Sequence, residues 1–382
     1  MQLQQINSLY SLLKTPKLFG RYVTNSHIEK CLTKLPKSLI SVVGYSVEER
    51  PIYSLRFGNG PIKVLLWSQM HGNESTTTKA LFDCFNLFET NNEIPNRILK
   101  ACTLMVIPIL SPDGAERYTR LNANKIDLNR DAQDLSQPES RVLREVYTDF
   151  KPNYCFNLHG QRTIFGAGTS GNAATLSFLS PSQDEKRSLT QNRKTAMAII
   201  SQINELLQTE IPYAIGRYDD GFNFNCVGDT FQNFGVPTLL YEAGHYKNDY
   251  EREEVRRFIF IALIKALVVI SDGIYISGSK DYFEIPENSK CFHDIIIRNA
   301  RISEDDDNVL IDVAIQYKEV LKAGKVEFIP VVERISKLEK FFGHKEIDVK
   351  GAFVKTLENL ELKVGYENDF VLVNNKKIPL FV

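Results

Sequence analysis

The sequence predicts an α/β fold, a mostly parallel, mixed sheet flanked by helices, followed by a small, mostly β domain. Apolar strands alternate with helical stretches from about residue 40 to 273, as in sheets covered on both faces. After Asp272-Gly273 only short strand-like runs follow and helices are scarce. The 382 residues are about right for two domains. We therefore expect an N-terminal helical segment at 1–40, the α/β domain at 41–275 and a β domain of unknown role at 276–382.

Hydrophobic periodicity places the elements of the α/β domain. The run at 63–70 lacks alternation, as expected of a strand buried on both faces, and the helix at 138–150 has proline in its first turn. The expected strands are 41–44, 52–56, 63–70, 102–110, 154–159, 213–218 and 237–242. The expected helices are 75–89, 138–150, 182–210 and 250–271, and Ser111–Gly114 is expected to form a turn. In such sheets ligands bind at the carboxyl ends of the strands.

Turn residues separate the short runs of the C-terminal domain. The expected strands there are 282–285, 294–298, 309–317, 326–332, 361–364 and 370–373. The acidic run 304–307 is expected to be a solvated loop, and a calcium site is the weaker alternative because the spacing does not fit an EF-hand. His293 and His344 are expected to be structural or exposed.

Composition limits the class of protein and its partners. Hydrophobic residues make up 43% and charged residues 24%, which is typical of a soluble globular protein. The net charge of -1 indicates neither a nucleic-acid nor a membrane partner. No secretion signal or membrane span is recognised, and the six cysteines are scattered. We therefore expect a cytoplasmic protein with reduced thiols, and the oligomeric state stays open.

The segment His71-Gly72-Asn73-Glu74 follows the apolar run 63–70 and begins a helical one. An imidazole and a carboxylate three residues apart can turn toward one point and suit a zinc ion, which needs a third protein ligand. A single HxxE pattern is a weak signal. His159, at the end of the strand 154–159, is placed to be that third ligand, which predicts one Zn²⁺ per chain.

Glu242 ends the apolar strand 237–242, where burying a carboxylate is costly unless something requires it. The functional interpretation is a general base that takes a proton from a zinc-activated water. A solvated strand end or a structural ion pair is the alternative.

A polar segment before the second helix contains Arg120, Asn129 and Arg130. Arginine holds a carboxylate with two parallel hydrogen bonds, and asparagine adds a donor beside it. Asn129 and Arg130 are therefore a candidate clamp for a substrate carboxylate, and Arg120 is a candidate donor to the oxyanion of a tetrahedral intermediate. Taken alone, each arginine is most simply a surface charge.

The ordered motifs HGNE, SPDG, TR, DLNR, NLHG and YEAG resemble those of the zinc carboxypeptidase family, the carboxypeptidase A-like metallopeptidases, over about residues 40–273. The resemblance implies that family's fold and a hydrolase that removes residues next to a free C-terminal carboxylate. It implies zinc ligands at His71, Glu74 and His159, carbonyl polarisation by Arg120, carboxylate binding by Asn129 and Arg130, and Glu242 as general base and acid.

The chain departs from the family's pattern in two places. Asp131-Ala132-Gln133-Asp134 follows the clamp where typical members carry an aromatic residue. The nearest candidate for the family's substrate-capping tyrosine is Tyr218, and Tyr246 is a second one. Asp219, Asp220 and Asp229 are candidates for the floor of the pocket that holds the side chain of the substrate's last residue. If one of them reaches that floor, the enzyme would prefer substrates whose last residue has a basic or diamino-acid side chain.

Three functions were weighed. The first is a zinc metallocarboxypeptidase acting on peptide substrates. The second is a zinc amidohydrolase that deacylates small N-acyl amino acids or cleaves murein-type peptides and other amino-acid conjugates. The third, a non-catalytic binding protein that retains the fold, is disfavoured because every expected site position is filled.

Overall fold

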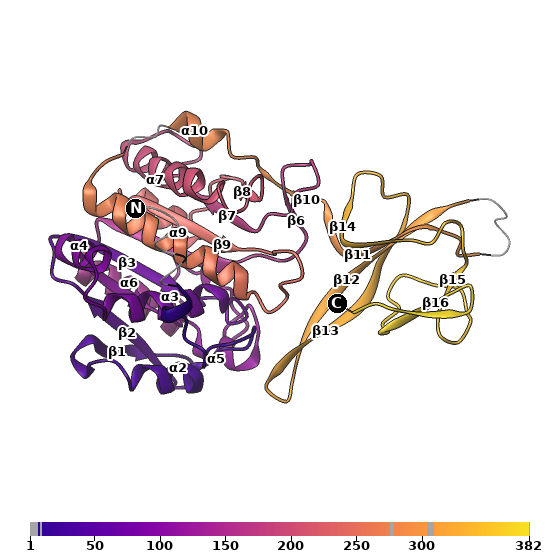
Figure 1. Ribbon diagram of the computed structural model, residues 1–382. Helices are drawn as coiled ribbons and strands as arrows, with labels where there is room; N and C mark the ends of the chain where they lie inside the picture. The colour runs from indigo at the N-terminus through magenta and orange to yellow at the C-terminus, as the bar shows by residue number, and fades with distance from the viewer. Residues whose placement is uncertain (1–6, 8–9, 276–278, 304–308, 382) are drawn as a thin grey trace.

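The computed structural model describes residues 7, 10–275, 279–303 and 309–381, and within them an eight-stranded sheet forms the centre of the α/β domain (Figure 1). Its order is β1-β2-β4-β3-β5-β9-β7-β8. The central strands β4, β3, β5 and β9 are parallel to one another. Strand β2 pairs antiparallel with β1 and β4. Strand β7 pairs antiparallel with β9 and parallel with β8. The strands are β1 (Ile40–Tyr45), β2 (Pro51–Phe57), β3 (Ile62–Ser68), β4 (Cys102–Ile107), β5 (Tyr154–Gly160), β7 (Leu176–Leu179), β8 (Ile215–Arg217) and β9 (Thr238–Ala243). The predicted mixed, mostly parallel sheet is confirmed.

Helices cover both faces of this sheet. On β3, Val64 and Leu66 point into one core and Leu65 and Trp67 into the other, as the two-residue period of a strand requires. The larger core includes side chains from α3 (Thr76–Phe88), α4 (Glu93–Ala101), α7 (Gln191–Leu207) and α9 (Glu253–Asp272). The opposite core includes α6 (Pro138–Phe150) and α8 (Val227–Asn233). Shorter helices are α2 (Asn25–Leu32), η1 (Lys37–Leu39), α5 (Pro112–Arg117) and η2 (Leu128–Arg130).

The C-terminal part is a lobe of β-strands with its own apolar core (Figure 1). One sheet has the order β13-β12-β11-β14 and a smaller one the order β15-β16-β17. The elements are α10 (Ser279–Phe283), β10 (Asn288–Lys290), β11 (Phe292–Ala300), β12 (Ile311–Lys322), β13 (Lys325–Ser336), β14 (Phe342–Asp348), β15 (Val354–Lys355), β16 (Phe370–Val373) and β17 (Lys376–Pro379). The predicted mostly β C-terminal region is confirmed; its boundary at residue 276 stays a prediction.

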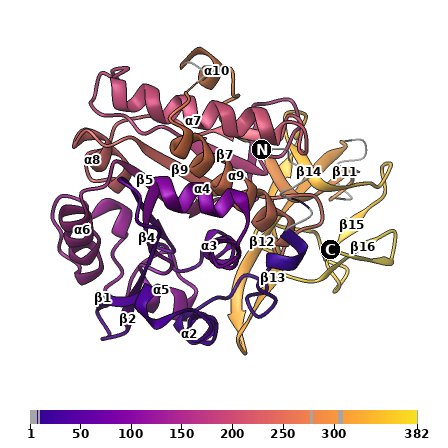
Figure 2. The same cartoon turned by 60° about the vertical axis from the view of Figure 1, so that its left-hand side comes forward.

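The two lobes are joined by backbone and side-chain contacts. β10 pairs antiparallel with β6 (Phe165–Ala167), which belongs to the α/β domain. Gln316 on β12 donates to the hydroxyl of Thr163 (2.7 Å), and His344 on β14 donates through Nε2 to the Thr163 carbonyl (2.8 Å). Arg21 pairs with Glu319 on β12 (3.0 Å), and Figure 2 shows β12 and β13 on the side of the lobe nearer the α/β domain. The C-terminal lobe is therefore packed against the α/β domain.

Several predicted elements differ from the structure. Residues 282–285 are not a strand, because Tyr282 lies in α10 and packs into the larger core of the α/β domain. Residues 361–364 form only an isolated bridge at Glu361. The helix predicted from 182 begins at Gln191, and the predicted turn at Ser111–Gly114 is the start of α5. The acidic run at 304–307 lies outside the described residues. The sequence did not predict helices α4, α8 and α10 or strands β6, β7, β10, β14, β15 and β17.

Among the described residues, no helix combines the length and the apolar character that crossing a membrane requires.

Candidate metal centre and substrate pocket

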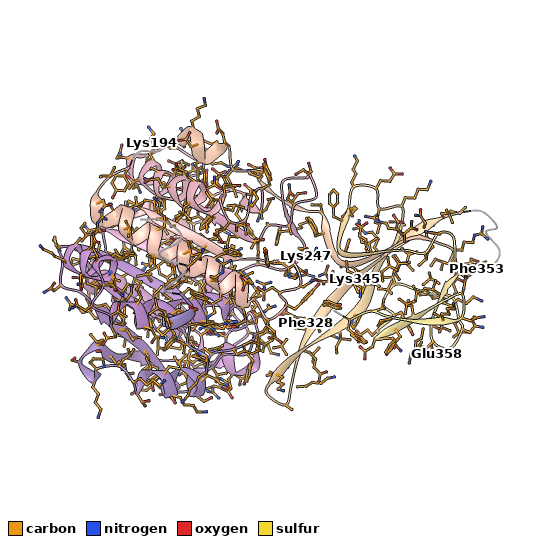
Figure 3. The ribbon with its side chains drawn as sticks, viewed as in Figure 1. Lys194, Lys247, Phe328, Lys345, Phe353 and Glu358 are labelled. Carbon is orange, nitrogen blue, oxygen red and sulfur yellow. The ribbon has the colours of Figure 1, made fainter. Side chains whose placement is uncertain are left out.

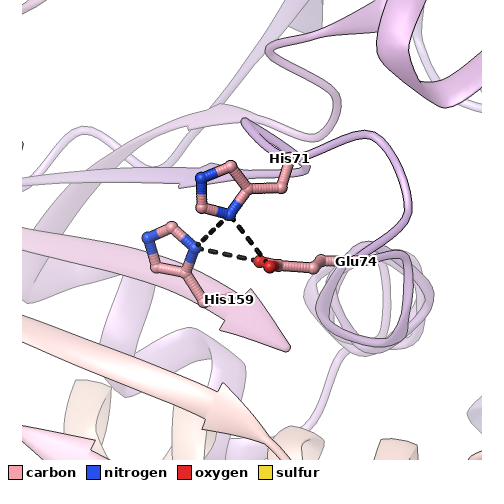
Figure 4. A group of neighbouring side chains, drawn as sticks. All are labelled: His71, Glu74 and His159. Carbon is pink, nitrogen blue, oxygen red and sulfur yellow. Dashed lines mark hydrogen bonds and ion pairs between the residues drawn. The ribbon is translucent and has the colours of Figure 1, made fainter. Parts of the chain in front are cut away.

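His71, Glu74 and His159 meet at the carboxyl edge of the sheet (Figure 4). His71 follows β3, Glu74 precedes α3, and His159 lies at the end of the neighbouring strand β5. His71 Nδ1 is 2.9 Å from one carboxylate oxygen of Glu74, and His159 Nδ1 is 2.9 Å from the other. The two Nδ1 atoms are 3.2 Å apart. Three metal-ligating atoms from two strand ends and one helix start therefore face one point.

The geometry and chemistry of this donor set fit zinc. A tetrahedral zinc ion with bonds of about 2.0–2.1 Å places its ligand atoms roughly 3.3 Å apart, close to the separations of the three donor atoms. Both histidines are at most 2% exposed. Glu74 is held in place by the backbone N–H of Gly160 (3.0 Å). Burial opposes ionisation of Glu74, but His71 and His159 hold its pKa below the usual range.

Gly72 explains why the turn carrying His71 and Glu74 is so tight. A Cβ atom at Gly72 would lie 1.8 Å from the backbone carbon of Gly114, which is closer than any atom can approach. Only glycine lets the loop after β3 lie against α5. The sequence segments HGNE and SPDG thus pack against each other, and this contact positions both metal-ligating side chains.

Asp127 is a site residue that the sequence analysis did not assign. Its Oδ1 accepts a hydrogen bond from His71 Nε2 (3.1 Å), which leaves Nδ1 of His71 free to bind metal. Its Oδ2 is 3.0 Å from Nη2 of Arg120. The charges of His71 and Arg120 hold the pKa of Asp127 low although burial opposes this. The sequence marks Asp127 only by its position in the segment Asp127-Leu128-Asn129-Arg130, two residues before the clamp.

Replacing Asp127 with asparagine is expected to weaken zinc binding by about 10–100-fold, because the carboxylate that orients His71 is lost. Zinc affinity is measured by competition with a chelator of known strength. The matched control is Asp134→Asn, at an exposed aspartate in the same segment. Equal zinc affinity of Asp127→Asn and the wild type would show that Asp127 does not orient the ligand.

Glu242 lies beside the metal centre on β9, in register with His159 on β5. Its Oε2 is buried and has no hydrogen-bond partner among the described residues. Burial, and then the negative charge of Glu74, raise the pKa of Glu242 well above its usual range, while Arg120 and Arg252 oppose the shift. A carboxylate without a structural partner at this position is available to exchange a proton with a reacting group.

Arg120 lies against two of the three metal ligands, His71 and Glu74. It is 3.4 Å from Glu74 Oε1 through Nη1, and its Nε donates to Asp127 Oδ2 (3.1 Å). About half of the side chain is exposed, and it lines the pocket. The structure therefore brings Arg120 to the site, with part of its guanidinium group open to a substrate oxygen.

Asn129 and Arg130 lie in η2 and line the same pocket. The side-chain oxygen of Asn129 accepts from the backbone N–H of Val227 (3.0 Å), so its amide N–H₂ is left for a ligand. Arg130 donates to the carbonyl of Asn129 (2.7 Å) and contacts the sulfur of Cys226 (3.0 Å). No carboxylate of the described residues forms an ion pair with Arg130. The pair can thus accept a carboxylate from outside.

The pocket has a volume of about 700 Å³ and is lined by the predicted metal ligands, Glu242, Arg120 and the clamp of Asn129 and Arg130. Tyr218 lines it, and its ring is 5.3 Å from that of Phe165. Burial, and then the charges of Glu242 and Glu74, raise the pKa of Tyr218, so the phenol is neutral and can donate a hydrogen bond. Tyr246 packs on Phe258 and does not line this pocket. Of the two tyrosine candidates, only Tyr218 is in position.

The three aspartates considered for the pocket floor have different surroundings. Asp220 accepts a hydrogen bond from Arg193 and is 3.1 Å from Arg187, so its charge is already paired within the protein. Asp219 is 80% exposed. Asp229 is 7% exposed, lines the pocket, and accepts a long hydrogen bond from the backbone N–H of Asn223 (3.4 Å). Burial raises the pKa of Asp229 to about 7.

Comparison with known proteins agrees with this site. A family model described as zinc carboxypeptidase matches residues 25–254. The chain belongs to the zinc carboxypeptidase family. The triad of His71, Glu74 and His159 is the zinc-ligand set of this member, and the matched region ends before the C-terminal lobe.

Curated zinc carboxypeptidases match over short regions only. A probable carboxypeptidase 2 from Arthroderma benhamiae is 27% identical over 126 residues, which are 33% of this chain and 23% of that protein. Carboxypeptidase SOL1 from Arabidopsis thaliana is 26% identical over 163 residues, 36% of this chain and 33% of that protein. The chain thus spans between about a quarter and a third of the length of these relatives.

Solved zinc carboxypeptidase structures share the fold. A metallo-carboxypeptidase from Burkholderia cenocepacia superposes with a TM-score of 0.53 at 18% identity, covering 66% of this chain and 70% of that one. A metallo-carboxypeptidase from Pseudomonas aeruginosa, in complex with (2-guanidinoethylmercapto)succinic acid, has a TM-score of 0.52 at 17% identity, covering 65% and 69%. At these identities the likeness concerns the fold.

Proposed function

We propose that this protein is a zinc metallocarboxypeptidase that hydrolyses the amide bond next to a C-terminal residue with a free carboxylate. One observation carries the proposal: a zinc-ligand triad, an unpartnered buried glutamate and an arginine without an ion-pair partner among the described residues line one pocket. The triad and Glu242 would serve hydrolysis in general. The clamp of Asn129 and Arg130 narrows the reaction to bonds near a carboxylate.

Each residue has a role that its position supports. Asn129 and Arg130 hold the terminal carboxylate, and Tyr218 covers the bound residue and donates from its phenol. Arg120 donates to the scissile carbonyl oxygen as negative charge develops on it. Glu242 takes the proton of the attacking water and passes it to the leaving amine. His71, Glu74 and His159 would hold a zinc ion, which would lower the pKa of a bound water and supply Lewis-acid chemistry.

A comparison of two substrate sets tests the proposal against the deacylase alternative. The zinc-loaded protein is assayed with N-blocked tripeptides and with N-acetyl amino acids that end in the same residues. We expect kcat/KM to be at least about tenfold higher for the tripeptides, because the pocket extends beyond the metal and binds upstream residues. Hydrolysis of the N-acetyl amino acids alone would replace the proposal with the deacylase function.

We further propose that Asp229 makes the enzyme prefer a basic C-terminal residue. Asp229 is close enough to Arg130 of the clamp for the arginine to lower its pKa, which supports a place beside the side chain of the bound residue. An ion pair made in this partly buried place contributes about 1.5–3 kcal/mol. The Asp229 carboxyl also accepts a hydrogen bond from the backbone N–H of Asn223, in the loop before α8. Holding this loop is the alternative, purely structural role of Asp229.

The preference for lysine over glutamine is expected to rise as the pH increases from 6 to 8. The pKa of about 7 means that the Asp229 carboxyl is mostly neutral at pH 6 and mostly charged at pH 8. Its ionised fraction, and with it the ratio of the two kcat/KM values, increases up to roughly tenfold. Asp229→Asn should abolish the increase, and Asp219→Asn is the matched control. A ratio that does not change with pH in the wild type would refute this role.

A cytoplasmic location remains part of the proposal. It is supported by the free thiols of all six cysteines, five of which are buried, because a reducing compartment preserves free thiols.

A further inference from the structure

The C-terminal lobe supplies part of the wall of the catalytic pocket. Tyr317, Lys318 and Glu319 of β12 line it together with residues of the α/β domain. Phe328, labelled in Figure 3, lies on the side of β13 that faces the α/β domain, 5.3 Å from the ring of Tyr250 and 5.9 Å from the guanidinium carbon of Arg21. The lobe therefore borders the space in which a substrate would lie.

Glu319 fixes this wall to the α/β domain. Its carboxylate is 3.0 Å from Nη2 of Arg21 and accepts a hydrogen bond from the hydroxyl of Tyr118. Arg21 keeps the pKa of Glu319 below its usual range although burial opposes this, so the group is charged and engaged. Lys318 is engaged too, 3.2 Å from Glu367. The charges contributed by β12 are thus neutralised within the protein.

Arg252 is a cation at this end of the pocket that forms no ion pair with the described residues. Its side chain is fully buried and donates to the carbonyls of Ala243 and Gln161, the latter at 2.6 Å. Its Nε has no partner, and no carboxylate in the described part of the chain forms an ion pair with it. Buried guanidinium groups are normally paired, because the desolvated charge is costly. Burial, and then Arg21, lower the pKa of Arg252 to about 10.

A second guanidinium group adds to this positive charge. Arg162 follows Gln161 directly, lines the pocket and is exposed to solvent. Within residues 10–275, 279–303 and 309–381 it has no ion-pair partner. Arg162 and Arg252 therefore add two guanidinium groups without an ion-pair partner among the described residues to the pocket that β12 borders. Glu319, which pairs with Arg21, offsets part of the charge of Arg252.

This cationic end lies away from the carboxylate clamp. Arg130 has Cys226 and Asn129 as neighbours, whereas Arg252 contacts Ala243 and Gln161, which follow Glu242 and His159 at the ends of β9 and β5. The charged neighbours differ as well: Arg21 and Glu319 act on Arg252, whereas Asp229 is the carboxyl beside Arg130. If the clamp holds the C-terminal residue, as the proposed function requires, the acyl side of the substrate runs toward Arg252.

We propose that Arg252 and Arg162, enclosed by β12 of the C-terminal lobe, form a subsite for an anionic group on the acyl side of the scissile bond. The preferred peptides carry a glutamate or aspartate at one of the two positions before that bond. The inference rests on the proposed function only for the direction in which the substrate lies. Binding at the subsite itself depends on the two arginines and not on hydrolysis.

The test compares blocked peptides that share a C-terminal residue and carry glutamate or glutamine at either of the two preceding positions. At low ionic strength kcat/KM is expected to be at least about tenfold higher for glutamate at one of them, the difference made by a charge-assisted hydrogen bond. The ratio should fall as salt is added. A ratio near one at both positions overturns the proposal.

Variants assign the effect to the subsite. Arg252→Gln and Arg162→Gln are each expected to reduce the glutamate-to-glutamine ratio at least threefold while the glutamine peptides are still cleaved. Arg257→Gln is the matched control, because Arg257 lies on α9 and pairs with Glu210 and Glu254 away from the pocket. If Arg252→Gln fails to fold, the test of the subsite rests on two measurements. These are the glutamate-to-glutamine ratio of Arg162→Gln, a variant at an exposed residue, and the salt dependence of that ratio in the wild type. An unchanged ratio in Arg162→Gln together with no salt dependence overturns the proposal.

A binding measurement separates this inference from the proposed function. The zinc-loaded Glu242→Gln variant is titrated with the same peptides by calorimetry. Tighter binding of the glutamate peptide, at least about tenfold in Kd, supports the subsite even if the wild type cleaves no peptide, in which case only the proposed function fails. Equal Kd values for the two peptides overturn the subsite while leaving hydrolysis intact.

Discussion

Glu242→Gln is expected to lower kcat for peptide hydrolysis by between about 10²- and 10⁴-fold, the contribution of a positioned general base and acid. Glutamine keeps the shape and polarity of the side chain at the end of β9 but cannot take up a proton. Because Glu242 is not one of the three zinc ligands, the bound zinc should stay at one equivalent per chain. The measurement combines steady-state kinetics with metal analysis on the same preparation.

The control for this variant is Glu145→Gln, at an exposed glutamate on α6. It removes one carboxylate of the same type without approaching the pocket and should retain wild-type kcat. A Glu242→Gln enzyme with wild-type kcat would show that the proton is carried by another group. The reaction would then need a different base, and Tyr218, which lines the same pocket, would be a candidate.

His159→Ala is expected to remove both zinc and activity. The remaining pair, His71 and Glu74, offers only two of the three protein ligands that catalytic zinc sites use. Zinc content should fall from one equivalent to near zero after dialysis, and kcat/KM by at least about 10³-fold, because one water-activating and polarising group is lost. Circular dichroism checks that the fold is retained.

His27→Ala is the control, since His27 lies in α2 and caps that helix away from the pocket. It should retain one equivalent of zinc and wild-type activity. Retention of tightly bound zinc in His159→Ala would mean that the metal is held by a different set of side chains. That outcome would contradict the triad and, with it, the assignment of His71 and Glu74.

The site residues predicted from the sequence share one physical property. His71, His159 and Glu242 each stand at the carboxyl end of a strand, and the parallel arrangement of β3, β5 and β9 brings such ends together. Strand ends can be recognised locally from where an apolar run stops. That is why the zinc ligands and the proposed base could be predicted without knowing which strands are neighbours.

Residues fixed by distant contacts could not be predicted in this way. Asp127 orients His71, which lies 56 positions earlier, and its loop has no periodicity that marks it. Glu319 meets Arg21 across 298 positions, so the role of the C-terminal lobe in the pocket has no local signal. The region at 282–285 reads as a strand by composition, but Tyr282 is drawn into the core of the other lobe as part of a helix.

The two ends of the pocket are expected to bind different parts of a peptide. Asn129 and Arg130 are proposed to bind the terminal carboxylate, and Arg252 and Arg162 are proposed to bind an anionic group on the acyl side, where β12 adds a wall. The family match ends at residue 254, before this wall begins. Substrate selection on the acyl side is therefore the property in which this chain is expected to differ from relatives that lack such a lobe.

The proposed reaction is hydrolysis, within this pocket, of the bond next to a free terminal carboxylate. The most direct measurement incubates the zinc-loaded protein with a blocked peptide that ends in a free carboxylate and with its C-terminal amide, and follows the products by mass spectrometry. We predict release of a single C-terminal residue from the acid, and cleavage of the amide at least about tenfold slower, because Arg130 loses its anionic partner. Equal cleavage of acid and amide, or products cut at internal bonds, would contradict the account.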